Sequence, residues 1–223
     1  MKIIIFAAIL FLSAELTAQL NGEAGYTVAY VKADKTNALI DYYNANGTNK
    51  LTDMKSLHIL DGFNIGATYR MGLWKTGIFW ESLSSTLSSV EGDIDQNTGL
   101  ERKLYFYMNS LSGVIEFQYN SIGFGTSVDY NYFSIKTSIS GTESKIPLHK
   151  ENFYSSKIYM IFYMRGSDNL GIAFKPYVRM PWSESSVDAV RDFLQIDKSF
   201  NTTEKFIQFG ITFTLLNGPQ PDF

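Results

Sequence analysis

Cysteine is absent from the 223-residue sequence, which excludes disulfide bonds, thiol nucleophiles and cysteine-based metal sites. The formal net charge is only −3 and like charges form no block, so the sequence predicts no nucleic-acid partner and no polybasic membrane anchor. Beyond the N-terminus no apolar run is long enough for a membrane helix. No repeat, linker or low-complexity tract divides the chain, which predicts a single domain.

The N-terminal segment MKIIIFAAILFLSAELTAQ is typical of a secretory signal peptide. It has one lysine, an apolar core from Ile3 to Leu12 and a plausible cleavage position at Ala18. A transmembrane anchor is the alternative, but the apolar run is shorter than the ~20 residues needed and Glu15 follows closely. We therefore expect a signal peptide over residues 1–18, export from the cytoplasm, and a mature domain over residues 19–223.

Apolar residues recur at alternate positions along most of the remaining chain, which is the period of a β-strand. With a less regular segment over residues 76–90, the pattern predicts eight strands. The alternating apolar residues are Tyr26, Val28 and Tyr30; Phe63, Ile65, Ala67, Tyr69 and Met71; Leu104, Phe106 and Met108; Ile122, Phe124, Val128 and Tyr130; Ile158, Met160, Phe162 and Met164; Leu170, Ile172, Phe174, Val178, Met180 and Trp182; and Ile207, Phe209, Ile211, Phe213 and Leu215.

The alternation is interrupted in two strands. In the fourth, the apolar positions change from even numbers up to Met108 to odd numbers from Ile115, which predicts a β-bulge within residues 110–113. Pro176 lies inside another strand and has no N–H to donate, so we expect a local bulge or kink there.

Long and short connections alternate between the predicted strands. The long ones are residues 33–56, 91–102, 135–152 and 183–203, and the short ones are residues 72–75, 120–121 and 166–169. This order predicts an up-and-down meander with all long loops at one end.

Alternation alone does not distinguish a lipocalin-like soluble barrel, apolar inside, from a membrane barrel, apolar outside. The strands are about a dozen residues long, as in membrane barrels, whereas soluble strands centre on ~5 to 6 residues. Aromatic residues gather near the strand ends, and the polar positions are rich in Ser, Thr, Tyr and Asn. The sequence therefore predicts an all-β fold, an eight-stranded antiparallel transmembrane β-barrel with four long outer loops and three short periplasmic turns.

Three segments resemble a known group of proteins: the TAQ end of the signal peptide, the strand GIAFKPYVRMPW with its KPYV core, and the closing strand FIQFGITFTLLN. The chain is similar there to the small OmpA- and OmpX-like outer-membrane barrels, and in particular to the PorT-like barrel domains of Bacteroidota. The resemblance implies location in the bacterial outer membrane, with membrane lipid as the surrounding partner.

An eight-stranded barrel is just wide enough for side chains to fill its interior. Seven charged residues fall on the predicted inner face, and unpaired charges there would cost several kcal/mol each, so we expect them to pair across the barrel. A narrow conduit or a ligand cleft is the alternative to a filled lumen. The seven are Arg70, Glu81, Glu116, Asp129, Arg165, Lys175 and Arg179.

The resemblance makes catalysis an alternative, because some eight-stranded outer-membrane barrels modify lipid A. The only histidines are His58 and His149, and the nearest candidate nucleophiles are the serines of the third strand, Ser84, Ser85 and Ser88. The His-x-Ser motif of the deacylases is absent, and we predict neither a catalytic set nor a cofactor.

Two predicted loops carry further candidates. Asp93, Asp95 and Asn97 supply oxygen ligands at alternate positions, but their spacing departs from the EF-hand loop, so calcium binding stays open beside a plain polar loop.

The segment SVDAVRDFLQ predicts a short outer helix, with Ser185 and Asp188 resembling a capping box. Its apolar stripe packs on the barrel rim or docks a protein partner, and TNALIDYY in the first loop offers a second such surface. The stripe consists of Val187, Val190, Phe193 and Leu194.

These observations favour a non-enzymatic outer-membrane barrel that serves envelope structure or recognition through its outer loops, with a role as accessory subunit of an envelope complex left open. An outer-leaflet lipid-modifying enzyme and a soluble periplasmic lipocalin-like carrier are the alternatives. The carrier predicts that Phe63, Ile65 and Tyr69 face inward.

Overall fold

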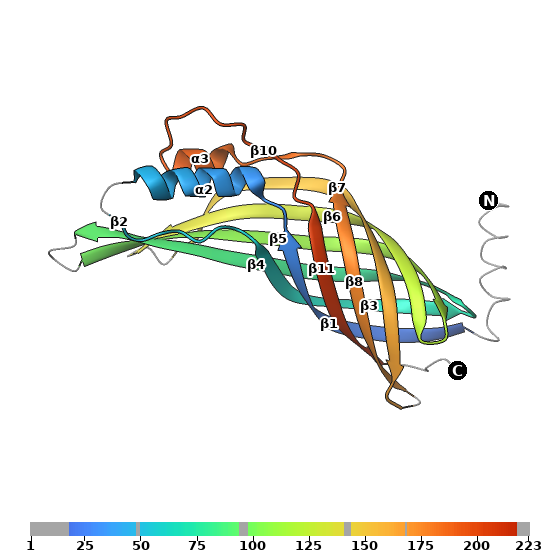
Figure 1. Ribbon diagram of the computed structural model, residues 1–223. Helices are drawn as coiled ribbons and strands as arrows, with labels where there is room; N and C mark the ends of the chain where they lie inside the picture. The colour runs from blue at the N-terminus through green and yellow to red at the C-terminus, as the bar shows by residue number, and fades with distance from the viewer. Residues whose placement is uncertain (1–17, 48–49, 94–97, 141–143, 168, 218–223) are drawn as a thin grey trace.

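A computed structural model describes residues 18–47, 50–93, 98–140, 144–167 and 169–217. In this part of the chain eight strands form a closed antiparallel barrel (Figure 1), which confirms the predicted fold class. Neighbours in the chain pair in order, and β1 pairs with β11 to close the ring. The strands are β1 (Ala18–Val31), β3 (Ile59–Met71), β4 (Trp74–Asp93), β5 (Thr98–Tyr119), β6 (Ile122–Ile139), β7 (Ile146–Arg165), β8 (Leu170–Pro181) and β11 (Gln208–Asn217).

Tight turns join the strands at one end of the barrel. Gly72 and Asn120 have positive φ angles of 60° and 51°, which two-residue hairpin turns need and which Gly and Asn tolerate best. We call this the short-turn end. The opposite end carries a cap, which we define as residues 32–47, 50–58 and 182–207. The cap contains helices α2 (Asp34–Asn46) and α3 (Asp188–Phe193) and the short strands β2 (Lys50–Thr52), β9 (Ser185–Ser186) and β10 (Thr203–Glu204).

Strands β4 to β7 are much longer than the other four. They have 18 to 22 residues, against 10 to 14 for β1, β3, β8 and β11. Two of the expected long connections, residues 91–102 and 135–152, are therefore mostly strand. Figure 1 shows the far ends of β4 to β7, which we call the extension, projecting beyond the barrel. Helices α2 and α3 lie over the extension and cover one of its faces.

The bulge expected within residues 110–113 is wrong. β5 pairs with both neighbours without a register shift, and its even-numbered residues are buried from Leu104 to Gln118. Phe106 and Met108 are buried inside, whereas Leu111 and Ile115 are 55% exposed on the outside. The apolar residues change sides because the surroundings of the strand change, from the exposed apolar outer surface of the barrel to a core beneath the cap.

β4 makes the same change. Ile78 and Trp80 face outward, whereas Leu83 and Leu87, further along the strand, are buried inside. The outward positions beyond Trp80 are Ser82, Ser84, Thr86 and Ser88. The irregular pattern of this segment therefore marks where the strand leaves the apolar zone.

Pro176 interrupts a ladder without shifting it. The β7–β8 register is the same on both sides of a gap between the pairs Tyr159↔Tyr177 and Phe162↔Phe174. The expected bulge is thus absent, and the missing pairs follow from the proline having no N–H.

The cap and the extension enclose a hydrophobic core like that of a water-soluble domain. α2 buries Leu39 and Ile40, and α3 with its flanks buries Val187 and Val190. They pack with inward side chains of the extended strands, among them Leu83, Leu87, Leu104, Phe106, Phe133 and Ile135.

α2 receives its N-terminal cap from a distant strand. Glu204 of β10 accepts hydrogen bonds from the backbone N–H groups of Lys35 and Thr36, each at 2.8 Å, while Ala33 at the N-cap position offers no side-chain bond. This contact ties the helix to the last connection of the chain.

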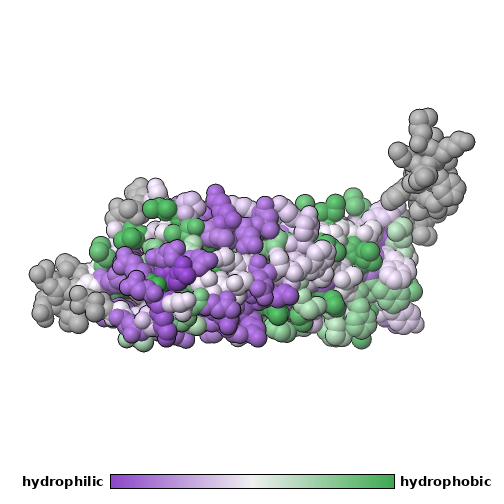
Figure 2. Space-filling model, turned by 90° about the horizontal axis from the view of Figure 1, so that it is seen from above, coloured by the Kyte–Doolittle hydropathy of each residue, from purple (hydrophilic) through white to green (hydrophobic). Residues whose placement is uncertain are grey.

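The outer surface of the barrel is apolar toward the short-turn end. Figure 2 shows hydrophobic residues gathered over that end and hydrophilic residues over the cap and extension. Aromatic side chains mark the transition, where Tyr130, Tyr154 and Trp182 form a row of ring contacts across β6, β7 and the end of β8. No helix in the described ranges is both long and apolar enough to traverse a membrane.

Candidate functional site

The lumen contains two clusters of paired charges. The first lies toward the short-turn end and joins two lysines to two glutamates. Lys175 lies 2.9 Å from both Glu23 and Glu116. Lys75 lies 2.9 Å from Glu116 and pairs with Glu23 as well. Each lysine thus bridges the same two carboxylates, and the four charges cancel.

Neutral side chains complete the first cluster. The Tyr159 hydroxyl donates to Glu116 Oε1 at 2.8 Å, and Thr68 Oγ1 donates to Glu23 Oε1 at 2.9 Å. Buried carboxylates gain most from such additional donors, because each lone pair left without a partner adds to the desolvation penalty.

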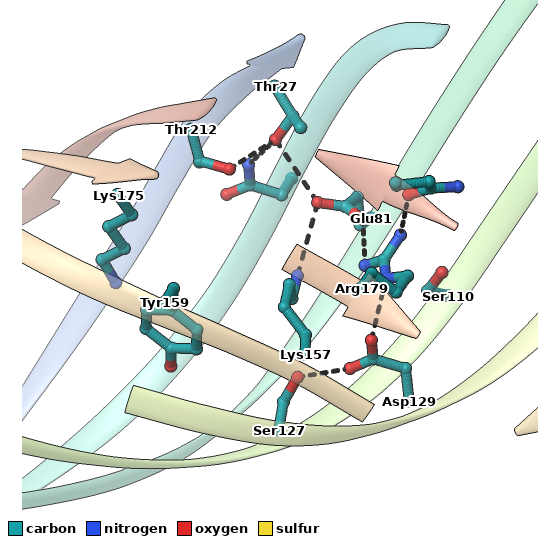
Figure 3. A network of polar contacts seen from close by, with 12 residues as sticks. Thr27, Glu81, Ser110, Ser127, Asp129, Lys157, Tyr159, Lys175, Arg179 and Thr212 are labelled. Atoms are coloured by element: carbon teal, nitrogen blue, oxygen red, sulfur yellow. Dashed lines mark hydrogen bonds and ion pairs between the residues drawn. The ribbon is translucent and has the colours of Figure 1, made fainter. Parts of the chain in front are cut away.

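The second cluster is centred on Arg179, which is fully buried (Figure 3). Its Nε donates to Asp129 Oδ2 at 2.9 Å, its Nη2 pairs with Glu81, and its Nη1 donates to Gln208 Oε1 at 3.0 Å. Lys157 Nζ lies 3.7 Å from Glu81 Oε2. Two cations and two anions again balance.

Little open space is left between the clusters. A cavity of about 40 Å³ separates them, lined by Tyr159, Lys175 and Tyr177 among others. A single water needs roughly 10–15 Å³ by this measure, so the space accommodates only a few waters. The buried hydroxyl of Tyr177, a residue that lines this cavity, has no hydrogen-bond partner among the described residues.

The residues expected in the lumen divide into three groups. Glu81, Glu116, Asp129, Lys175 and Arg179 lie in the two clusters. Arg70 is buried near the short-turn end, where its Nη2 donates to Gln118 Oε1 at 2.6 Å. Arg165 differs from the expectation, because its side chain is exposed. It has the inward-facing parity, but it is the last residue of β7, at the open rim.

Sequence reasoning missed three members of the clusters: Glu23, Lys75 and Lys157. The alternation pattern places Lys75 in a short turn and Glu23 in the segment before the first strand. β1 in fact begins at Ala18 and β4 at Trp74, which places both residues on inward positions. Lys157 shares the parity of Tyr159, so extending the alternation by one residue pair finds it.

Neither histidine belongs to a charge cluster of the lumen. His58 is exposed and stacks on Tyr30, with ring centroids 5.9 Å apart. His149 Nε2 lies 3.2 Å from Glu151 Oε2. Within the described ranges neither histidine is hydrogen-bonded to a serine, so the structure does not bring together the Ser–His–acid geometry that acyl transfer needs.

The possible calcium loop falls mostly outside the described residues, since Asp95 and Asn97 belong to residues 94–97. Elsewhere in the described chain, no cluster of three or more His, Cys, Asp or Glu side chains forms a candidate metal site.

The stripe proposed as an interaction surface is not available to a partner. Val187, Val190 and Leu194 are buried in the core beneath the cap, and Phe193 packs against that core. The stripe is apolar because it faces this chain's own extended strands. The second proposed surface, in the first loop, is likewise part of α2, whose Leu39 and Ile40 are buried.

The expected capping box at Ser185 is also wrong. Ser186 Oγ accepts from the backbone N–H of Asp188, and Thr202 Oγ1 donates to Asp188 Oδ1 at 2.7 Å. Ser186 Oγ also donates to Asp188 Oδ2 at 2.7 Å, and the hydrogen bonds from Thr202 and Ser186 to the carboxylate lower the pKa of Asp188 below its usual value. Asp188 thus joins the start of α3 to the returning segment before β10.

The residues of β3 that face outward contradict the alternative of a soluble carrier. That alternative expected Phe63 and Ile65 to line the interior, but they are 52% and 55% exposed on the outside. The interior holds charged clusters instead of an apolar ligand cavity.

Comparison with known proteins finds no matching family model and no matching curated protein. Among solved structures, the chain is similar to Ail, the attachment invasion locus protein of Yersinia pestis, in complex with the heparin analogue sucrose octasulfate, with TM-score 0.49, 12% identity, and 91% of this chain and 99% of that chain covered. It is also similar to Neisserial surface protein A, with TM-score 0.41, 10% identity and coverage of 90% and 96%. A third is the translocator domain of the autotransporter NalP from Neisseria meningitidis, with TM-score 0.41, 7% identity and coverage of 96% and 93%.

Proposed function

We propose that this chain is a sealed, non-enzymatic outer-membrane β-barrel protein whose barrel holds the cap rigidly at the outer face of the membrane for recognition. The observation that carries the proposal is the exposed apolar outer surface of the barrel. Ile78 is 64% exposed, and Trp74, Ile65 and Phe63 each exceed half. Soluble proteins rarely leave so large a contiguous apolar surface in water.

Export follows in the proposal from the signal peptide over residues 1–18, and the long-loop end faces outward as in other such barrels. Assignment to the PorT-like group rests on the sequence features alone, above all the KPYV strand. A role as subunit of an envelope complex is likewise carried only by that resemblance.

The filled lumen supports the role of a rigid scaffold for the cap, which we call the platform, and not the role of a channel. Both charge clusters are neutral, and the space between them is only about 40 Å³. Recognition is assigned to the cap because it stands on a rigid scaffold and presents polar surface.

Cell fractionation combined with gel mobility tests the proposal. The protein should enter the outer-membrane fraction and migrate faster on SDS gels before boiling than after it. Reconstituted in planar bilayers, it should give no stepwise conductance. A soluble periplasmic species without a mobility shift overturns the proposal, and regular conductance steps overturn the sealed lumen.

A further inference from the structure

A second, larger pocket opens in the cap. Its volume is about 250 Å³, and it lies between the C-terminal end of α2, the residues after α3, and the extended parts of β4 and β5. The parts of β4 and β5 that line it belong to the extension, over which α2 and α3 lie (Figure 1). Its lining includes Tyr42, Tyr43, Asn46, Glu91, Arg102 and Gln195.

Arg102 offers the pocket an oriented pair of donors. Its Nε donates to Glu91 Oε2 at 2.8 Å, and its guanidinium carbon lies 5.6 Å from the centroid of the Phe193 ring. Within the described chain, Nη1 and Nη2 have no hydrogen-bond partner. A guanidinium fixed through Nε presents its remaining N–H groups in the fork geometry that suits a carboxylate or phosphate.

Glu91 is fully engaged in holding this arrangement. Besides Arg102, it accepts a hydrogen bond from the Tyr43 hydroxyl. Burial, together with this bond, raises the pKa of Tyr43 above its usual value, so the phenol stays protonated and keeps donating. The carboxylate therefore positions Arg102 rather than competing for a ligand.

Gln195 occupies a backbone position that favours glycine. Its φ is 55°, and the pairs Gln195 N–H to Asp192 O and Ile196 N–H to Arg191 O, both 3.1 Å, form a Schellman motif after α3. Glycine adopts this conformation without the steric penalty that a side chain brings. The glutamine side chain lines the pocket, where its amide can both donate and accept.

Other polar groups line the pocket, and two lysines lie over its tyrosine rings. Asn46 uses its amide N–H to bond Tyr42 O, which leaves its Oδ1 as an acceptor. Lys50 and Lys198 each lie 5.5 Å from the ring centroid of Tyr43 and Tyr42, respectively. The pocket thus combines the Arg102 guanidinium with amide and phenol groups that match the hydroxyls of a sugar.

We propose that the cap pocket binds an acidic saccharide unit, a sugar ring that carries a carboxylate or a phosphate. Arg102 receives the oxyanion through Nη1 and Nη2, and Gln195 and Asn46 bond the ring hydroxyls. The volume is below the ~300 Å³ at which drug-sized sites begin, which suits a single ring. The inference rests on the proposed function, because it requires the cap to face the exterior.

Binding is measured on the folded full chain in detergent micelles by isothermal titration and saturation-transfer NMR. The probes are glucuronate, glucose 6-phosphate, glucose and inorganic phosphate. At least one of the two acids should bind about tenfold more tightly than both glucose and phosphate. Which acid binds identifies the oxyanion that the pocket takes.

Three variants separate binding from folding. Arg102→Gln should weaken binding of the acid about tenfold, whereas Lys103→Gln, the same change of charge at the neighbouring outward-facing residue, should leave it within about twofold. Gln195→Gly should weaken binding while keeping or raising heat stability, because the backbone strain is relieved.

The inference is overturned if neither acid binds, if glucose or phosphate binds as tightly as the acids, or if Arg102→Gln and Gln195→Gly bind like the parent. Gel mobility of the same preparation tests the proposed function independently. If the protein shows the heat-dependent gel shift but binds neither acid, the proposed function stands and the inference of a saccharide ligand is overturned.

Discussion

Arg179 and Glu81 meet across the axis of the barrel. Arg179 lies on β8 and Glu81 on β4, and these strands are four positions apart in the ring of eight, on opposite walls. The two residues are 98 positions apart in the chain. A contact of this kind exists only when the ring is closed, so it ties the stability of the barrel to its topology.

Removing Arg179 should therefore destabilise the barrel strongly. Arg179→Ala leaves Glu81 and Asp129 buried with reduced compensation, and breaking a buried pair typically costs about 3–5 kcal/mol. Arg191→Ala removes an arginine from exposed pairs with Asp188 and Asp192 and should cost less than about 1 kcal/mol. The temperature at which the compact gel band converts to the unfolded band measures both, and equal shifts for the two variants contradict the central role of Arg179.

The apolar zone ends between Trp80 and Ser84 on the outer face of β4. Ile78→Lys places a charge in the proposed lipid zone and should cost about 2–4 kcal/mol, with loss of the heat-shifting band. Ser84→Lys makes the same residue on the same face of the same strand six positions further, and should stay within about 0.5 kcal/mol. If Ser84→Lys harms assembly as much as Ile78→Lys, the boundary is misplaced.

Replacing Val190 by a charged residue should unfold the cap and leave the barrel folded. Val190 is fully buried on α3, so Val190→Asp places an unpaired charge in the core beneath the cap. We expect new protease cleavage within residues 183–205 while the gel shift persists. Ala189→Asp at the half-buried neighbouring position should be cleaved far less. Resistance of Val190→Asp to protease would show that α3 is not held by this core.

Glu204 should make cap stability depend on pH. Burial raises the pKa of its carboxyl above the usual value, although the N–H groups of Thr36 and Lys35 partly offset this effect. A raised folded-state pKa means that the folded cap binds the proton more tightly than the unfolded chain. The contribution of Glu204 is therefore most favourable below the unfolded pKa and falls as pH rises through the folded pKa.

Hydrogen exchange of α2 measured against pH tests this sign. Exchange protection in the parent, relative to Glu204→Gln, should decline as pH rises through this window. Asp188 has a lowered pKa, so the parent measured relative to Asp188→Asn should lose protection of α3 as pH falls. If exchange protection changes with pH in the same direction in both comparisons, the opposite pKa shifts of Glu204 and Asp188 are contradicted.

Much of the barrel is determined locally by the sequence. Alternation at period two assigns each residue to one face of a strand, and it placed Lys175 and Arg179 inside without any knowledge of their partners. The positions of the short turns follow from local backbone chemistry, as at Gly72 and Asn120. These features depend on neighbours in the chain, which is why they can be predicted.

Only the tertiary structure decided how far along the barrel each residue lies. Alternation looks the same on the apolar outer surface of the barrel and beneath the cap, so the residues from Leu104 to Met108 predict a bulge where the strand only passes from one surrounding to the other. Arg165 has inward parity yet lies at the rim, and the stripe around Val190 faces this chain's own core. Ring closure and the folding of the cap join segments about 100 or more residues apart, and no local period encodes which of them meet.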